Sequence, residues 1–189
     1  MTAFEVLPAT RHTRMRWANG GGWTTELIAE PSSSSWEWRL SVADVDAAGP
    51  FSPLPGVDRS IALLRGNGFA LTVGGGSERV IDAPFHAFDF SGDEATSCRL
   101  IDGPVQDVNL MTRRGSIPLR LEFIHMPPSS TIELSNVEVV VVVHGRARIF
   151  GHELGYLDAI RSSSRSASLR LTAMQPGAVV TSVIRPTHG

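Results

Sequence analysis

The chain has 189 residues, 42% of them hydrophobic and 19% charged, with a formal net charge of −2. This composition is typical of a chain that buries a core as one large domain or two small lobes; it excludes disorder, and it gives no basis for a nucleic-acid or membrane-surface partner. All 17 cationic residues are Arg, which excludes Schiff-base chemistry and a P-loop lysine, and the single cysteine, Cys98, excludes internal disulfides. The start of the chain has no apolar segment of signal-peptide length, so we expect a cytoplasmic protein.

The predicted elements are nearly all strands, because apolar residues recur at every second position and no long stretch keeps a helical period. In residues 36–42 every second side chain is large and apolar, which places Glu37, Arg39 and Ser41 on the opposite face. Residues 137–143 are nearly all Val, so both faces of that strand are expected to be buried. In chain order, strands are expected near 24–30, 36–42, 60–65, 68–73, 94–101, 105–112, 119–123, 137–143, 146–150, 168–172 and 178–185. Many short strands with close turns indicate a sandwich or a barrel.

A faint internal repeat supports two lobes. Residues 62–66 (ALLRG) resemble residues 142–145 (VVHG), and each stretch is followed by an alternating strand and then by an Asp-Ala turn, at residues 82–83 and 158–159. A strand, a Gly turn, a second strand and an Asp-Ala turn fit one β-barrel lobe, so two copies predict two lobes.

The sequence carries no recognisable catalytic or metal-binding constellation. No two of the six histidines lie within seven residues of each other; they are His12, His86, His125, His144, His152 and His188. Metal sites in small barrels commonly use closely spaced histidines, so the spacing supports none. A Gly-x-Ser-x-Gly elbow is absent, and Cys98 falls in an expected strand, where a core role is favoured. We therefore expect no metal, no cofactor and no catalytic residue.

The Gly-rich stretch 17–24 (WANGGGWT) has two interpretations. It is either a bulged turn between two strands or the rim of a pocket, where consecutive glycines let the backbone approach a ligand. In the second interpretation, Asn19 offers both a donor and an acceptor.

Arginines at unusual places are the remaining candidates. Arg39 lies in the middle of an expected strand, and Arg59 opens another. Inside a barrel, an Arg binds a carboxylate as a rigid fork. The alternative is a purely structural pairing with Asp58, Glu37 or Asp107.

Several phrases together resemble the HutD/Ves family. They are residues 17–26 (WANGGGWTTE), 38–45 (WRLSVADV), 49–52 (GPFS), 55–59 (PGVDR), 84–88 (PFHAF), 98–100 (CRL) and 107–113 (DVNLMTR). The resemblance is clear over residues 4–115 and holds only by pattern over 116–185. It implies an all-β bicupin, two small RmlC-like barrels without the cupin metal ligands. The expected lobes are residues 1–115, with the ligand pocket, and residues 116–189, degenerate and structural.

The resemblance also implies a non-enzymatic regulator of histidine utilisation that senses a small carboxylate such as formylglutamate or urocanate. Arg59, in the phrase Pro-Gly-Val-Asp-Arg, is then the carboxylate fork, Asn19 and Gly20 rim the pocket, and Arg39 and Ser41 line its wall. Four residues are expected to hold the arginines in position without contacting the ligand themselves: Asp58, Asp107, Asn109 and Arg113.

Two other functions stay open. A cupin enzyme, an isomerase or an oxygenase, is favoured only by analogy of fold. A protein–protein module is the other, with self-pairing into a homodimer through exposed strand edges or an apolar patch over residues 137–150.

Overall fold

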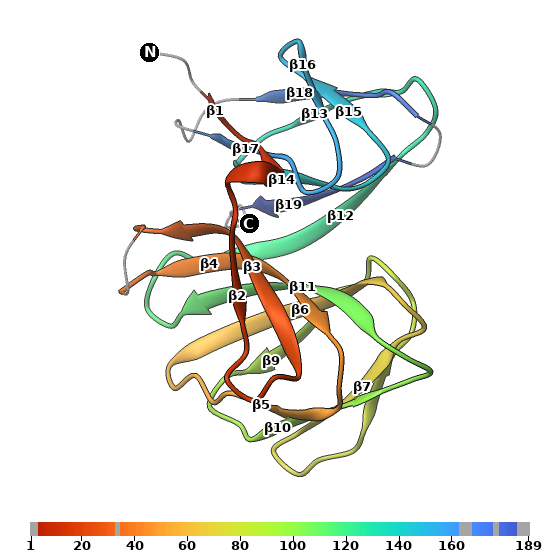
Figure 1. The fold of residues 1–189 in the computed structure, drawn as a ribbon. Helices are drawn as coiled ribbons and strands as arrows, with labels where there is room; N and C mark the ends of the chain where they lie inside the picture. Colours follow the sequence, from red (N-terminus) through yellow and green to blue (C-terminus); the bar gives the residue numbers. More distant parts are fainter. Residues whose placement is uncertain (1–3, 33–34, 163–167, 176–177, 185–189) are drawn as a thin grey trace. The chain divides into compact units, whose positions relative to one another are not determined.

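The computed structural model describes residues 4–32, 35–162, 168–175 and 178–184. The chain divides into two compact units, one of residues 13–117 and one that combines residues 1–12 with 118–189 (Figure 1). The described residues form strands throughout, apart from turns and one short 3-10 helix, η1 (Ala9–Arg11). The expected all-β architecture is therefore confirmed. No helix among the described residues is long and apolar enough to cross a membrane.

The unit of residues 13–117 consists of two antiparallel sheets. The larger sheet has the order β2 (Thr13–Arg16), β3 (Gly22–Glu30), β4 (Trp38–Val45), β11 (Val105–Arg113), β6 (Val57–Arg65) and β9 (Phe88–Ser91). The smaller sheet has the order β5 (Gly49–Phe51), β10 (Thr96–Leu100), β7 (Phe69–Val73) and β8 (Arg79–Ile81).

The core of this unit follows from the alternation of side chains along its strands. Ile61 and Leu63, two residues apart on β6, are fully buried in one cluster with Phe69 and Leu71 of β7. Cys98 of β10 belongs to the same cluster, as expected for a small core residue, and burial raises the pKa of its thiol to about 12. This cluster fills one part of the space between the two sheets and leaves another part for polar side chains.

The second unit also has two antiparallel sheets. One has the order β1 (Phe4–Leu7), β17 (Ala159–Ser162), β14 (Val137–His144), β19 (Ala178–Ile184) and β12 (Arg120–Met126). The other has the order β13 (Thr131–Leu134), β18 (Leu169–Ala173), β15 (Ala147–Ile149) and β16 (His152–Leu154).

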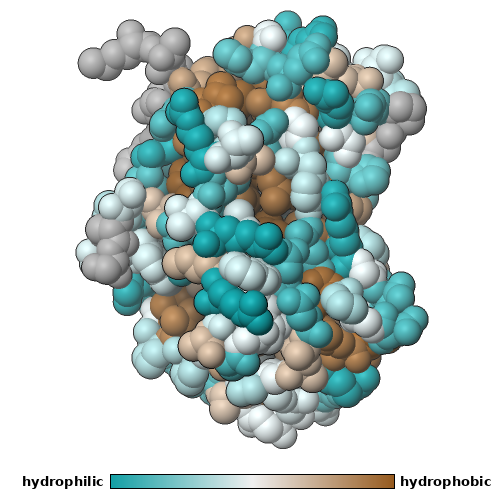
Figure 2. Space-filling view, in the orientation of Figure 1, coloured by the Kyte–Doolittle hydropathy of each residue, from teal (hydrophilic) through white to brown (hydrophobic). Residues whose placement is uncertain are grey.

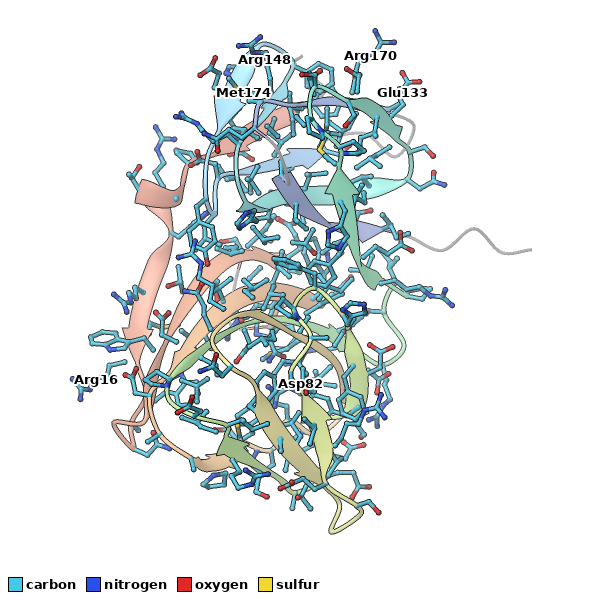
Figure 3. All side chains as sticks on the ribbon, turned by 90° about the vertical axis from the view of Figure 1, so that its right-hand side faces the viewer. Arg16, Asp82, Glu133, Arg148, Arg170 and Met174 are labelled. Atoms are coloured by element: carbon cyan, nitrogen blue, oxygen red, sulfur yellow. The ribbon has the colours of Figure 1, made fainter. Side chains whose placement is uncertain are left out.

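Apolar side chains fill the interior of this second unit. Val140, Ile149, Ile160 and Leu171 are all fully buried there in one cluster. Charged side chains occupy the alternate positions and point outward; Figure 3 labels Glu133, Arg148 and Arg170 among them. On the face drawn in Figure 2, apolar residues form separate patches among polar ones.

Three features differ from the sequence expectations. The first 12 residues belong to the second unit, because β1 pairs with β17. The strand expected at 36–42 begins only at Trp38, so Trp36 precedes β4. The apolar patch expected over 137–150 is not exposed: Val139 to Val143 are buried in the middle of their sheet, and the exposed large hydrophobic residue in that range is Phe150.

Candidate functional site

Strand register in the larger sheet of residues 13–117 gathers polar side chains into one region. Side chains that are paired across antiparallel strands lie on the same face, so each pairing extends a row across the sheet. Two rows cross β4, β11 and β6: Arg39 with Met111 and Arg59, and Ser41 with Asn109 and Ile61. In the next row Ala43 pairs with Asp107, and Asp107 with Leu63. Apolar Ile61 and Leu63 mark where the polar region meets the core.

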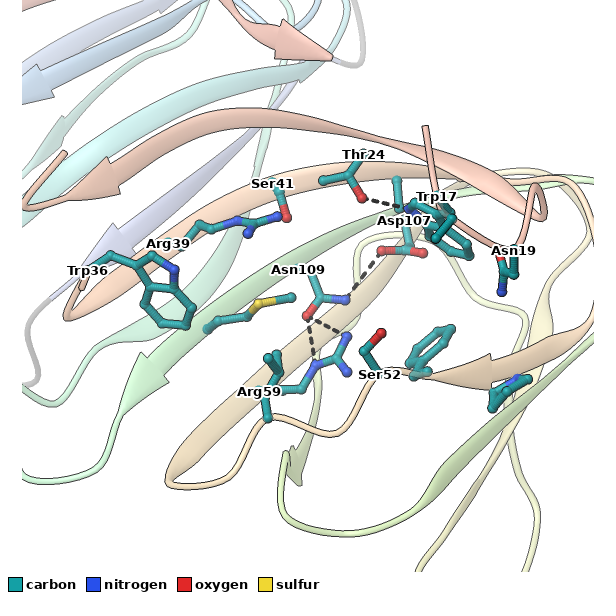
Figure 4. A pocket seen from close by; sticks show the side chains of 16 residues that line it. Trp17, Asn19, Thr24, Trp36, Arg39, Ser41, Ser52, Arg59, Asp107 and Asn109 are labelled. Atoms are coloured by element: carbon teal, nitrogen blue, oxygen red, sulfur yellow. Dashed lines mark hydrogen bonds between the residues drawn. The ribbon is translucent and has the colours of Figure 1, made fainter. Parts of the chain in front are cut away.

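These rows form one wall of a pocket of about 400 Å³ (Figure 4). Its lining residues come from β3, β4, β5, β6, β11 and the segments beside them. They are Trp17, Ala18, Asn19, Thr24, Trp36, Arg39, Ser41, Ala43, Pro50, Phe51, Ser52, Leu54, Arg59, Asp107, Asn109 and Met111. A cavity of this size with a few convergent polar groups is typical of a small-molecule site.

Arg59 is the most buried cation of the pocket, with 7% of the residue exposed. Its Nε and Nη2 both donate to Asn109 Oδ1 at 3.3 Å. Its guanidinium lies 5.0 Å from the ring centre of Phe51 and 4.9 Å from that of Phe90. Burial lowers the pKa of Arg59 to about 10, although the charge of Asp107 acts in the opposite direction. The side chain therefore stays cationic near neutral pH, held by aromatic rings and one amide, with no ion pair to a described carboxylate.

Arg39 supplies a second cation to the same pocket. Its Nε lies 3.3 Å from Glu26 Oε2, and its side chain is 21% exposed. The buried Nε has no hydrogen-bonding partner of acceptable geometry among the described residues, so the ion pair is loose. The charge of Arg39 also lowers the pKa of Arg59. Two guanidiniums that repel each other across a cavity favour an anion between them.

Asp107 is the buried acid of the pocket, with 1% of the residue exposed. Its Oδ1 accepts a long hydrogen bond, 3.5 Å, from Asn109 Nδ2. Burial raises the pKa of Asp107 to about 7, which outweighs the opposing effects of Arg59 and of the hydrogen bond from Asn109. The carboxyl therefore changes its charge within the physiological pH range.

The Gly-rich stretch is both a turn and a rim, so both interpretations from the sequence hold in part. Trp17 and Asn19 line the pocket from the turn between β2 and β3, and Trp17 Nε1 donates to Thr24 Oγ1 at 2.8 Å. Asn19 Oδ1 accepts from the Gly21 amide at 3.0 Å, which leaves the Asn19 side-chain amide group at the pocket edge. Gly20 has a φ of +72° and shapes the turn, but it does not line the pocket.

The structure brings together six of the nine site residues expected from the sequence: Asn19, Arg39, Ser41, Arg59, Asp107 and Asn109. The other three are Gly20, Asp58 and Arg113. Asp58 neighbours Arg59 on β6 and so points to the opposite face, where its carboxylate accepts from Arg114 Nε at 2.7 Å. Arg113 does not reach the arginines either: its Nε donates to the Trp36 carbonyl at 2.8 Å, and its guanidinium lies 5.0 Å from the Trp36 ring.

Several lining residues were missed from the sequence. Trp36 was expected on the buried apolar face with Trp38, but it lines the pocket beside Arg39 because β4 starts after it. Met111 and Phe51 were not singled out. The alternation of Asp107, Asn109 and Met111 along β11 was the available signal for Met111.

The five histidines that the structure describes do not gather into a metal site. Among the described residues, no group of three or more His, Cys, Asp or Glu side chains is placed to hold a metal ion. His86 Nδ1 bonds the Pro84 carbonyl at 2.8 Å, and His12 Nε2 bonds the Leu157 carbonyl at 2.9 Å. His188 lies outside the described residues.

Comparison with known proteins places the chain in a family. The family model described as HutD matches residues 9–181, which is most of the chain. The chain belongs to the HutD family. This HutD-family protein is 40% identical over 113 residues to an uncharacterised 21.2 kDa protein of Pseudomonas putida from the region 3′ of hutC, a match that covers 59% of each chain. It is also 39% identical over 99 residues to Protein Ves of Cronobacter sakazakii, which covers 52% of this chain and 54% of that protein. The chain thus matches less than two thirds of the length of these curated relatives.

Solved structures extend the similarity over nearly the whole chain. HutD from Pseudomonas fluorescens SBW25, solved in a formate condition, has a TM-score of 0.80 and 30% identity, and covers 98% of this chain and 100% of its own. A quercetin 2,3-dioxygenase from Acinetobacter baumannii has a TM-score of 0.64 at 13% identity, covering 97% of this chain and 79% of its own, and shows the fold alone. These neighbours have cupin folds, which confirms the expected bicupin architecture.

Proposed function

We propose that this HutD-family protein binds a small carboxylate in the pocket of residues 13–117 and acts, without catalysis, as a ligand-dependent regulator of histidine utilisation. The observation that supports this proposal most strongly is that Arg39 and Arg59 both line one cavity of about 400 Å³. Neither guanidinium has a close, well-aligned ion pair with a described carboxylate. A bound carboxylate would supply the missing negative charge.

The link to histidine utilisation rests on the family. One relative is named for its position 3′ of hutC, and another is named HutD and was solved in a formate condition. Formylglutamate and urocanate fit this context as ligands because both are small carboxylates. The filled apolar interior of the second unit supports a structural role for that unit.

The first test is a thermal-shift titration with formylglutamate, urocanate, histidine and glutamate, followed by calorimetry on any compound that raises the melting temperature. A ligand that binds only the folded state stabilises it by about 2.7 kcal/mol at a hundredfold excess over Kd. We expect at least one of the four to bind, and Arg59→Ala to remove the binding.

Arg79→Ala is the matched control. Arg79 also lies over an aromatic ring, 5.7 Å from the centre of Phe88, but it is outside the pocket. Binding that survives Arg59→Ala, or a flat response to all four compounds, contradicts the proposal. Stoichiometric metal in the purified protein would favour the cupin-enzyme alternative.

A further inference from the structure

A site that only binds carboxylates does not need a buried acid such as Asp107. Asp107 lines the same cavity as Arg59 and Arg39, and 1% of it is exposed. A carboxylate wall is unfavourable for an anionic ligand, because like charges in a desolvated site repel. A role for Asp107 must therefore involve a different part of the ligand.

The bonds around Asp107 leave one of its oxygens available. Asn109 Nδ2 donates to Oδ1 at 3.5 Å, which is at the weak end of hydrogen bonding. Oδ2 receives no hydrogen bond from the described part of the chain. Figure 4 shows the carboxyl group at the cavity wall, above Asn109 and next to Trp17. Oδ2 is not among the fully buried atoms of the described residues left without a partner, so it opens onto the cavity, where it can accept from a donor on the ligand.

Other groups around Asp107 do not supply that donor. Arg59 on β6 acts on Asp107 through its charge but forms its hydrogen bonds with Asn109. Asp44 on β4 adds a repelling negative charge, and the pKa of the Cys98 thiol on β10 is raised to about 12, partly by Asp107 itself. Thr24 on β3, also in the lining, accepts the indole N–H of Trp17, and among the described residues its hydroxyl forms no hydrogen bond with Asp107. None of these groups gives Oδ2 a proton.

We propose that the pocket selects carboxylates that also carry an N–H group, with the carboxylate held by Arg59 and Arg39 and the N–H donated to Asp107. The ligand class is then an N-acyl amino acid, an amino acid or an imidazole-bearing acid, rather than a plain carboxylic acid. The inference rests on the proposed function, since it assigns a second recognition point within the same site.

Matched ligand pairs test the proposal directly. N-formylglutamate is compared with 2-formyloxyglutarate, in which an ester oxygen replaces the N–H. Urocanate is compared with 3-(oxazol-4-yl)acrylate, in which a ring oxygen replaces the N–H and the other ring nitrogen is kept. For any pair of which one member binds, we expect calorimetry to give the N–H member roughly tenfold or more higher affinity, as for a charged hydrogen bond. In Asp107→Asn the preference is expected to fall below about threefold, because the acceptor loses its charge.

The pH dependence gives a second readout. A carboxylate without an N–H should bind more weakly as the pH rises through about 7, where Asp107 loses its proton and becomes anionic. Its N–H partner should not weaken, because an ionised Asp107 accepts the bond more strongly. Neither Arg59, with a pKa of about 10, nor Cys98, near 12, changes charge between pH 6 and 8.

The outcomes separate the two proposals. Equal affinity within each binding pair, combined with loss of binding in Arg59→Ala, overturns the inference and leaves the carboxylate site intact. No binding by any member overturns both. If Asp107→Asn fails to fold, the ligand pairs on the unaltered protein still decide the question.

Discussion

Arg59 donates through both Nε and Nη2 to a single oxygen of Asn109, at 3.3 Å each. A guanidinium has five N–H groups, and sharing one neutral acceptor between two of them holds its orientation without neutralising its charge. Asn109 in turn points its amide nitrogen at Asp107. The three side chains form a chain of bonds in which the cation and the acid are kept apart by an amide.

The first prediction concerns the geometry of Arg59. Arg59→Lys keeps the charge but loses the planar fork, so we expect carboxylate affinity between those of the unaltered protein and Arg59→Ala. Losing the charged hydrogen bonds entirely corresponds to roughly 1.5–3 kcal/mol, or about a tenfold to hundredfold weaker Kd. Calorimetry with the best ligand measures this series. An affinity of Arg59→Lys equal to that of the unaltered protein would assign no role to the fork.

The second prediction separates binding from stability at the same residue. Arg59 is buried between Phe51 and Phe90, and burial lowers its pKa, so its charge costs folding free energy. Arg59→Met fills similar space without charge and is expected to unfold at an equal or higher temperature while losing the ligand. Thermal unfolding by circular dichroism checks it. A clear drop in melting temperature would instead assign Arg59 to the structural framework.

The third prediction is a pH dependence of stability. The folded-state pKa of Asp107 is raised from 3.8 to about 7, so between these values the folded protein holds a proton that the unfolded chain releases. Asp107 therefore makes stability fall as the pH rises through this window, by at most about 1.4 kcal/mol per pH unit, with no further loss above it. Urea denaturation at several pH values measures the slope, and subtracting the profile of Asp107→Asn isolates it. Identical profiles would contradict the shifted titration.

The fourth prediction distinguishes the consecutive glycines. A Cβ at Gly22 would lie 2.3 Å from the backbone oxygen of Asp44, whereas at Gly21 the nearest atom would be Asn19 Oδ1 at 3.4 Å. Gly22→Ala is expected to destabilise by about 1–3 kcal/mol through overpacking. Gly21→Ala, the matched control, should stay within about 0.5 kcal/mol. Chemical denaturation of both variants is the measurement, and similar losses in the two would argue against close approach at Gly22.

The fifth prediction concerns the loop that carries Leu54 at the pocket wall. Arg114 Nε donates to Asp58 at 2.7 Å, and Nη1 is also bonded to Asp93, whose Oδ1 accepts the Gly56 amide at 2.6 Å. Arg114→Ala removes this tie, so we expect faster amide exchange at residues 54–57 and a severalfold weaker Kd, with little change in overall stability.

Arg99→Ala is the control for that variant. Arg99 forms a comparable exposed ion pair with Glu78, but away from the pocket. Its loss should leave both the exchange pattern of residues 54–57 and the affinity unchanged. Unaltered exchange in Arg114→Ala would mean that the remaining bonds of the loop are sufficient to hold it, among them the backbone bonds from Leu54 to Gly92, from Gly92 to Val57 and from residue 114 to Gly56.

Sequence reasoning located the long strands well, because alternation and valine runs are strong local signals. The observed β11 and β14 overlap their expected ranges almost completely, and β6 contains its expected range but begins three residues earlier, at Val57. Eight short strands of three or four residues were missed, because so few residues carry too little periodicity and tertiary pairing decides their state; they are β1, β2, β5, β8, β9, β13, β16 and β17.

The residues of the candidate site could likewise be predicted only where they lie in a strand with a clear alternating pattern. Successive side chains along a strand point to opposite faces of the sheet, so the face could be predicted for Arg39, Ser41, Asp107 and Asn109. The same rule shows why Asp58 could not join Arg59. Trp36 was misplaced because it lies two residues before β4, where the alternation of faces along the strand no longer applies. The raised pKa of Asp107 depends on burial by distant strands, which no local pattern encodes.

The two units differ in the order in which their paired strands are synthesised. Residues 13–117 are contiguous, so every strand of the pocket unit has emerged before the other unit can close. In contrast, β1 pairs with β17, and the valine-rich β14 waits for β19. During that interval Val139 to Val143 can pair with β17 on one side only, and their other edge is an open, uncharged stretch of high strand propensity, the kind that recruits other chains. Chains whose synthesis stops before residue 178 should therefore retain a formed pocket yet aggregate through β14, so this protein's solubility during synthesis depends on β19.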